Sequence, residues 1–314
     1  MTVGQQKQAQ QATRAGDSGA RLLLVVLCLI WGVTWPVMKI ALNEIPPLSM
    51  RTSTAAIGAV TLALICVFQR RSLRVPPGRA WVHVVIASFL NVSAFSICSA
   101  FAQVAAATSR VAILTYTLPI WAMLLSWAVL GERPNRVQGI AVVLCILGLG
   151  ILIYPLAATG VPLGLALALG AGMSWAAGTV YLKWARIKAD PMGVASWQVT
   201  IAFFVLAACL LIFDGRPDFS GAHADALAAV AFTGIVGNAV AYALWFEIVR
   251  RLPATTASLG ILGIPVIGVF STVLILGERP TAADLIGFAF IFAASACIVL
   301  TPQGVQADTA QPTT

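Results

Sequence analysis

The sequence has little charge for its length. Of its 314 residues, 10% are Asp, Glu, Lys or Arg and 60% are hydrophobic. Soluble domains carry roughly a quarter of charged residues, so this chain has too little polar surface to cover a water-soluble globule of its size. The composition excludes an ordinary soluble protein and indicates a chain whose main solvent is lipid.

Groups that carry most enzyme chemistry are also scarce. The two histidines, His83 and His223, lie far apart, and the six cysteines include no Cys-x-x-Cys pair. These features argue against a metal site. No Walker-type phosphate loop is present, which argues against an ATP-driven pump. We therefore expect no cofactor, no metal and no catalytic residue, and an intramembrane enzyme is a disfavoured alternative.

Long uncharged runs are abundant. Nine of them are long enough to cross hydrocarbon, which takes roughly 20 residues. The run from Val137 to Leu182 is too long for one crossing and contains Pro155, Gly160 and Pro162, which interrupt helices. Splitting it predicts ten transmembrane helices and an all-α fold. The runs are continuously apolar, which excludes a transmembrane β-barrel.

Lys and Arg are distributed unevenly around these helices. With the amino terminus inside, fourteen fall on the cytoplasmic side, Lys39 ends the first helix, and four fall outside. Basic residues favour the cytoplasmic side, so we predict a multi-pass cell-membrane protein with both termini in the cytoplasm. Orientation thus explains the net charge of +8 without a nucleic-acid partner. The outer four are Arg51, Arg110, Arg216 and Arg279.

The chain divides into two units between polar tails. Residues 1–20 form a polar N-terminal tail without the apolar core of a signal peptide, and residues 302–314 form a C-terminal tail that we expect to be disordered. The units between them are residues 21–154 and 162–301.

The two units repeat one another. At an offset of 146, Pro119 aligns with Pro265, and the LGERP sequence at 130–134 aligns with LGERP at 276–280. Such coincidences indicate a duplication. Each unit has five helices, an odd number, so the second must cross the membrane in the opposite sense. The prediction is two inverted five-helix repeats, a plan found in secondary transporters.

These residues resemble the drug/metabolite transporter superfamily, and within it the ten-helix EamA-type exporters. The resemblance is carried by Trp31-Gly32 and by Pro119 and Pro265, each followed by LGERP. It implies a secondary transporter that exports small metabolites by alternating access through a central cavity. The chain is most similar to bacterial exporters of aromatic amino acids. A multidrug or organic cation exporter and a sugar or metabolite permease remain alternatives, and a channel is disfavoured because no ring of charge is present.

The resemblance also implies that helices one, three, four, six, eight and nine surround the cavity. Amides need partners in lipid, and aromatic rings facing a cavity would favour flat or cationic apolar solutes. Alternatively, each ring belongs to the interfacial belt and each hydroxyl bonds to its own helix. The candidate substrate-binding residues are Trp31, Trp35, Asn91, Phe95, Ser99, Thr115, Tyr116, Trp175, Thr179, Asn238, Tyr242 and Trp245.

Pro119 and Pro265 lie near the middle of predicted helices four and nine. A proline there removes one helical hydrogen bond, so each is a candidate hinge for alternating access or, alternatively, a static kink.

Acidic residues fall at helix ends, among them Glu247 beside Arg250 and Arg251, for which we predict an ion pair. We therefore expect facilitated or exchange transport without an obligatory carboxylate proton site. The expected partners are a small-molecule substrate and membrane lipid, and the sequence leaves monomer and homodimer open.

Overall fold

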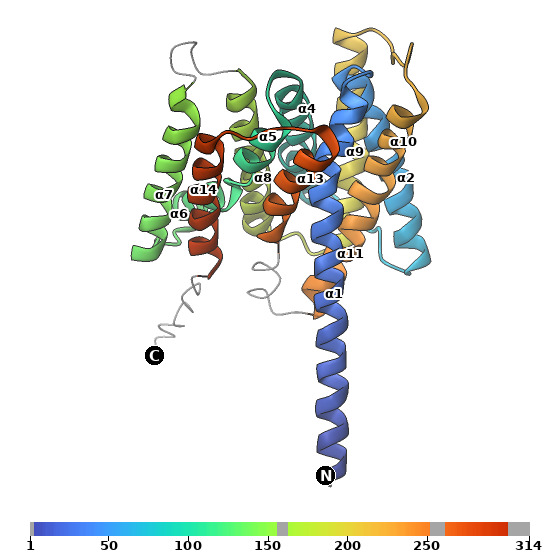
Figure 1. The fold of residues 1–314 in the computed structure, drawn as a ribbon. Coiled ribbons are helices and arrows are strands. Elements are labelled where there is room, and N and C mark those ends of the chain that lie inside the picture. The colour runs from blue at the N-terminus through green and yellow to red at the C-terminus, as the bar shows by residue number, and fades with distance from the viewer. Residues whose placement is uncertain (1–2, 156–162, 252–260, 301–314) are drawn as a thin grey trace.

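The protein is a bundle of helices. A computed structural model describes residues 3–155, 163–251 and 261–300, and no strand occurs in these ranges. The helices run roughly parallel and antiparallel to one another (Figure 1). This confirms the prediction of an all-α fold.

The first part of the chain contains α1 (Val3–Leu42), α2 (Pro47–Phe68), α3 (Arg79–Ser88), η1 (Phe89–Ala94), α4 (Phe95–Ala105), α5 (Thr108–Thr115), α6 (Leu118–Leu130) and α7 (Arg136–Ile153). The second part contains α8 (Leu163–Ala185), α9 (Pro191–Phe213), α10 (Ala224–Phe232), η3 (Thr233–Val240), α11 (Ala241–Arg251), α13 (Gly263–Leu276) and α14 (Ala282–Leu300).

Ten apolar helical segments occur in the described ranges. Eight are long and apolar enough to cross a membrane, and two shorter ones cover Gly263–Leu276 and Ala282–Cys297. Three of the eight join elements across local irregularities: Arg79–Ala105, Thr108–Leu130 and Ala224–Ile248. These segments agree with the ten predicted helices. The predicted break at Gly160 and Pro162 lies outside the described residues.

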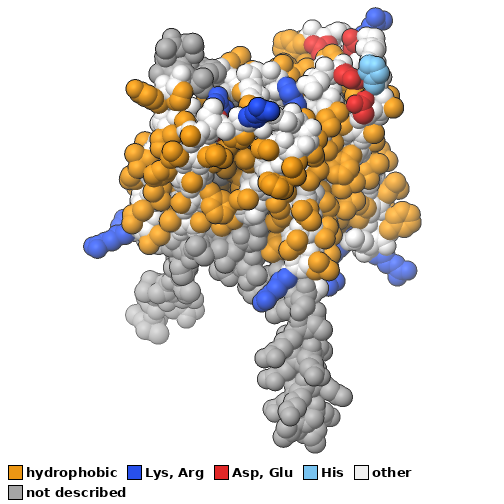
Figure 2. All heavy atoms as spheres, viewed as in Figure 1, with side chains coloured by type: hydrophobic (Ala, Val, Ile, Leu, Met, Phe, Trp, Pro, Cys, Tyr) orange, Lys and Arg blue, Asp and Glu red, His pale blue; other side chains and the backbone are white. Residues whose placement is uncertain are grey.

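The outer surface of the bundle is apolar. Hydrophobic side chains form a broad band between two ends where charged side chains gather (Figure 2). Leu22, Phe68, Ile146, Phe204 and Leu274 are each more than 60% exposed. Water would make such a surface costly, whereas lipid suits it, so this is a multi-pass membrane protein.

The chain ends and connections are arranged about the long axis of the bundle. The beginning of α1 and the end of α14 lie at the same end, the lower one in Figure 1. The α6–α7 and α13–α14 connections lie at opposite ends. Residues 3–20, predicted as a polar tail, continue α1 as helix. The C-terminal tail lies outside the described residues.

Helix packing joins distant parts of the sequence. α2 packs on α9 and α7 on α14, while α1 packs on α11 and α13 and α8 packs on α4 and α6. Glycine permits the closest approaches: a Cβ on Gly172 would come within 2.6 Å of the Thr115 carbonyl oxygen, and one on Gly164 within 2.7 Å of the Ala106 Cβ. Small residues on α8 thus let neighbouring backbones touch.

Two predicted helices contain π-helical segments that the sequence analysis missed. η1 interrupts the helical segment Arg79–Ala105 at Phe89–Ala94, and η3 interrupts the segment Ala224–Ile248 at Thr233–Val240. Each π turn shifts the following side chains around the helix axis, and such segments are frequent at functional sites.

The fourth predicted helix is broken where a kink was expected. α5 ends at Thr115, two residues form a turn, and α6 restarts at Leu118 with Pro119 in its first turn. Pro265 is likewise the third residue of α13. Proline is tolerated in a first turn because those N–H groups have no helical acceptor. Both prolines therefore lie at helix starts, and the start marked by Pro119 is inside the span Thr108–Leu130.

Candidate substrate-binding site

Five predicted residues from four helices form one aromatic cluster. Trp31 of α1 lies 6.4 Å from Trp175 of α8, 6.4 Å from Tyr242 and 6.2 Å from Trp245 of α11, measured between ring centroids. Phe95 of α4 meets Trp175 edge to face at 4.7 Å. All five side chains are partly exposed. The four helices therefore bring together rings that are neither fully buried nor fully exposed, and such rings can stack with one another or with a flat solute.

Trp31 is at the centre of this cluster and is held in a defined position. Its indole Nε1 donates a hydrogen bond of 3.1 Å to the carbonyl oxygen of Gly237 in η3. Gly237 lies directly against Thr34, because a Cβ at Gly237 would come within 3.0 Å of the Thr34 hydroxyl. α1 and the π segment thus approach closely, and the ring of Trp31 is fixed between them.

Both predicted asparagines lie in π-helical segments. Asn91 of η1 is buried, and its Nδ2 donates to Oε1 of Gln198 on α9 at 3.1 Å. Asn238 of η3 donates from Nδ2 to the Thr54 carbonyl oxygen on α2 at 3.4 Å. Each amide therefore has an interhelical partner. The buried Asn91 Oδ1 accepts no hydrogen bond from the part of the chain that the structure describes.

The other predicted residues lie outside the cluster. Trp35 is buried in the main hydrophobic core, and Tyr116 packs against that core at the break between α5 and α6. Thr115 and Thr179 donate to carbonyl oxygens of their own helices, at Val111 and Trp175. Their backbone bonds match the alternative reading for hydroxyls in membrane helices.

Ser99 contacts Arg51, which was predicted only as one of the four basic residues outside the membrane. Its Oγ accepts a hydrogen bond of 2.6 Å from Nη2 of Arg51, the fifth residue of α2, and both side chains are buried. Pro47 could have indicated this position of Arg51, because proline favours the first turn of a helix and Arg51 follows it by four residues. Four residues after Ser99, Gln103 is fully buried and donates to the Trp35 carbonyl oxygen at 3.4 Å.

A small cavity separates the two candidate hinges. Its volume is about 30 Å³, and Tyr116, Pro119, Pro265 and Ser295 line it together with apolar side chains. Ser295 of α14 donates to the Tyr116 carbonyl oxygen at 3.1 Å, which is one of the carbonyls freed by the helix break. The break between α5 and α6 and the start of α13 therefore line the same cavity.

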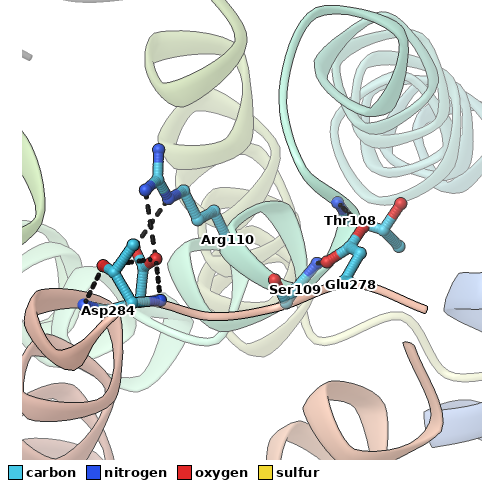
Figure 3. Close-up of polar contacts among 6 residues, drawn as sticks. Thr108, Ser109, Arg110, Glu278 and Asp284 are labelled. Carbon is cyan, nitrogen blue, oxygen red and sulfur yellow. Dashed lines mark hydrogen bonds and ion pairs between the residues drawn. The ribbon is translucent and has the colours of Figure 1, made fainter. Parts of the chain in front are cut away.

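One end of the bundle is tied by carboxylates (Figure 3). Arg110 of α5 donates from Nε and Nη2 to the two carboxylate oxygens of Asp284 at 2.6 and 3.1 Å. Beside this pair, Glu278 accepts from the backbone amides of Thr108 and Ser109. The α13–α14 connection is thus bound to the start of α5.

The opposite end carries exposed ion pairs. Lys183 lies 2.6 Å from Glu132, and Glu247 binds both Arg250 and Arg251, as predicted. The Glu247 carboxylate raises the pKa of the Arg250 guanidinium, chiefly through their hydrogen bond. Within the described residues, no group of three His, Cys, Asp or Glu side chains could hold a metal ion.

The sequence matches one protein family in both units. The EamA-like transporter family matches residues 19–154 and again residues 162–300. The chain belongs to the EamA-like transporter family. The protein is therefore a transporter and not an enzyme, and the cell membrane is the compartment that this family indicates.

Relatives of this EamA-like protein extend over most of its length. It is 24% identical to "Uncharacterized transporter YoaV" of Bacillus subtilis, covering 84% of this chain and 91% of that one. It is 26% identical to the "Probable amino-acid metabolite efflux pump" of Escherichia coli, covering 87% and 91%. A crystal structure whose name states no function shares the fold, with a TM-score of 0.62, 21% identity and 89% and 96% coverage.

Proposed function

We propose that this EamA-like transporter exports small metabolites, with amino acids as its substrates and aromatic amino acids preferred. The aromatic cluster of Trp31, Phe95, Trp175, Tyr242 and Trp245 carries the proposal. Its partly exposed rings come from four helices and offer edges and faces to a flat side chain. The name of the Escherichia coli relative, an amino-acid metabolite efflux pump, agrees with this substrate class.

We further propose that the two units are inverted repeats that exchange roles during transport. Helix bounds support this: α2 begins at Pro47 and α9 at Pro191, and the π segments begin at Phe89 and Thr233, each pair 144 residues apart. Gly131 and Gly277 both end a helix in the left-handed conformation, with φ of 73° and 67°.

Helix contacts support the same relation. α1 packs on α11 and α13 of the other unit, and α8 packs on the corresponding α4 and α6. α2 and α9 contact each other, as do α7 and α14, as expected for corresponding elements across a pseudo-dyad. A central site between such units can open to one side and then to the other. The excess of basic residues at one end favours cytoplasmic termini.

Transport in this proposal needs no carboxylate that carries a proton. Among the described acidic residues, Asp284 is the buried one, and its oxygens are occupied by Arg110 and by the amide and hydroxyl of Thr281. A carboxylate with that many donors favours its charged form. Exchange of substrates down their gradients is the proposed mode.

Counterflow in proteoliposomes tests the proposed function. Vesicles loaded with unlabelled tryptophan should accumulate labelled tryptophan at a saturable rate, and phenylalanine and tyrosine should compete better than alanine or glucose. Collapsing the proton gradient should leave the rate unchanged. Absence of counterflow for every amino acid would reject the proposal, and a linear, non-saturating flux would indicate a channel.

An organic cation exporter is the second candidate, because the faces of the clustered rings also attract cations. Tetraphenylphosphonium counterflow that exceeds tryptophan counterflow would favour it.

A further inference from the structure

Arg51 is a buried cation without a carboxylate partner among the described residues. Arg51 is 6% exposed, its Nη2 donates to Ser99 Oγ at 2.6 Å, and its buried Nε donates to no atom of the described residues. Burying a charge is costly unless it is paired and its donors are satisfied. One neutral hydroxyl does not neutralise a guanidinium.

Arg110 provides the contrast within the same molecule. It lies at the same end of the bundle, and both of its donating nitrogens bind the Asp284 carboxylate. Arg216, also at this end, is exposed to solvent. Arg51 has no carboxylate partner within the described ranges and is buried from solvent, so its charge is left without a counterion.

Arg51 is linked to the aromatic cluster through Ser99. Ser99 follows Phe95 by one turn on the same face of α4, and Phe95 packs on Trp175. On α2, Thr54 lies one turn after Arg51, donates its hydroxyl hydrogen to the Arg51 carbonyl oxygen, and accepts from Asn238. The guanidinium is therefore bonded to α4 one turn from Phe95, and the turn of α2 that carries Arg51 is bonded to η3 through Thr54.

We propose that Arg51 binds the carboxylate of the transported substrate, while the aromatic cluster receives its side chain. This inference rests on the proposed function. A guanidinium presents a planar fork that fits a carboxylate with two parallel hydrogen bonds. Ser99 acts as a positioning residue that fixes one arm of the fork. The substrate class narrows to amino acids and other aromatic carboxylates.

The test compares tryptophan with tryptamine, which lacks the carboxylate. In proteoliposomes of zwitterionic lipid, Arg51→Gln should reduce tryptophan counterflow by about tenfold or more, since hydrogen bonds to charged groups are strong, and change tryptamine counterflow by less than about twofold. Arg51→Lys, which keeps the charge without the fork, should fall between, and Ser99→Ala should weaken tryptophan counterflow less than Arg51→Gln. Arg216→Gln is the matched control and should behave as the wild type.

Thermal unfolding of the purified variants separates binding from misfolding. Tryptophan should raise the unfolding midpoint of the wild type and of Arg216→Gln, but not that of Arg51→Gln. If the wild type is neither stabilised nor active with either compound, the proposed function fails and this inference fails with it. If the wild type moves tryptophan and Arg51→Gln keeps the same preference over tryptamine, the inference alone is overturned.

The anion could also be a lipid headgroup. A parallel measurement therefore uses vesicles with phosphatidylglycerol. An effect of Arg51→Gln that arises only in these vesicles, with equal losses for both compounds, would assign Arg51 to lipid and overturn the inference.

Discussion

Glu278 accepts a hydrogen bond of 2.7 Å from the backbone amide of Thr108, 170 residues away in the sequence. Its other carboxylate oxygen binds the next amide, at Ser109, so one side chain caps the start of α5. Glu132 occupies the equivalent place in the first LGERP and pairs with Lys183 at the opposite end. The two copies of one motif thus hold different partners in this structure.

Replacing Glu278 by Ala should therefore destabilise the protein more than replacing Glu132 by Ala. Loss of the cap leaves two amides of α5 without their acceptor and should cost about 1–2 kcal/mol. The exposed Glu132–Lys183 pair should contribute less than about 1 kcal/mol. Thermal unfolding in detergent measures both, and equal midpoints would contradict the capping role.

Replacing Trp31 by Ala should remove most transport. The indole contacts three aromatic rings, and the variant loses all three contacts together with the hydrogen bond to Gly237. Trp31→Phe keeps a ring and should retain part of the activity. Counterflow rates should fall about tenfold or more for the Ala variant, because each aromatic contact contributes about 1 kcal/mol. Full activity of Trp31→Ala would show that the cluster does not bind substrate.

Gly178→Ala should disturb the site through Asn91. The added Cβ would lie 2.3 Å from Asn91 Oδ1 and 2.9 Å from the Asn91 backbone nitrogen. Such overpacking typically costs about 1–3 kcal/mol. Gly150→Ala is the matched control, since nothing lies within 4 Å of its Cβ and alanine favours helix. Unfolding midpoints should fall for the first variant and stay or rise for the second.

Replacing both Pro119 and Pro265 by Ala tests the hinge hypothesis. At Pro119 a restored N–H group would favour a continuous helix across the α5–α6 break, and at Pro265 the substitution would release the fixed backbone angle at the start of α13, so turnover should fall while tryptophan binding is kept. Counterflow and binding are measured on the same preparations. Unchanged turnover would mean that the prolines only shape the cavity between them.

Most of the fold could be predicted from the composition and from the repeated motifs. The uncharged runs predicted the spans because lipid admits few charges. Each LGERP sequence contains the glycine at which a helix ends, Gly131 or Gly277. Pro119 and Pro265 were predicted in mid-helix, whereas the structure has them in the first turns of α6 and α13. The ion pair of Glu247 followed from its neighbours in sequence.

Local backbone geometry was beyond the sequence. The π segments of η1 and η3 depend on interhelical packing, and no residue pattern announced them. These segments determine the directions in which the side chains of Asn91 and Asn238 point, and so which neighbouring helices they contact. Counting charges placed Arg51 outside the membrane. Its burial could not be predicted, because it depends on the packing of α4 against α2, where Ser99 meets Arg51. Five of the aromatic candidate residues lie in one cluster, whereas Trp35, on the same helix as Trp31, is buried in the hydrophobic core.

Alternating access by exchange of roles requires the two units to cross the membrane in opposite directions. Single cysteines at Arg133 and Arg279, in the two LGERP motifs, can be labelled in intact cells with a membrane-impermeant maleimide, using the unsubstituted protein as the background. Arg279→Cys should react from outside, and Arg133→Cys should react only after the cells are opened. Reaction of both from the same side would contradict the inverted arrangement and the alternating-access mechanism built on it.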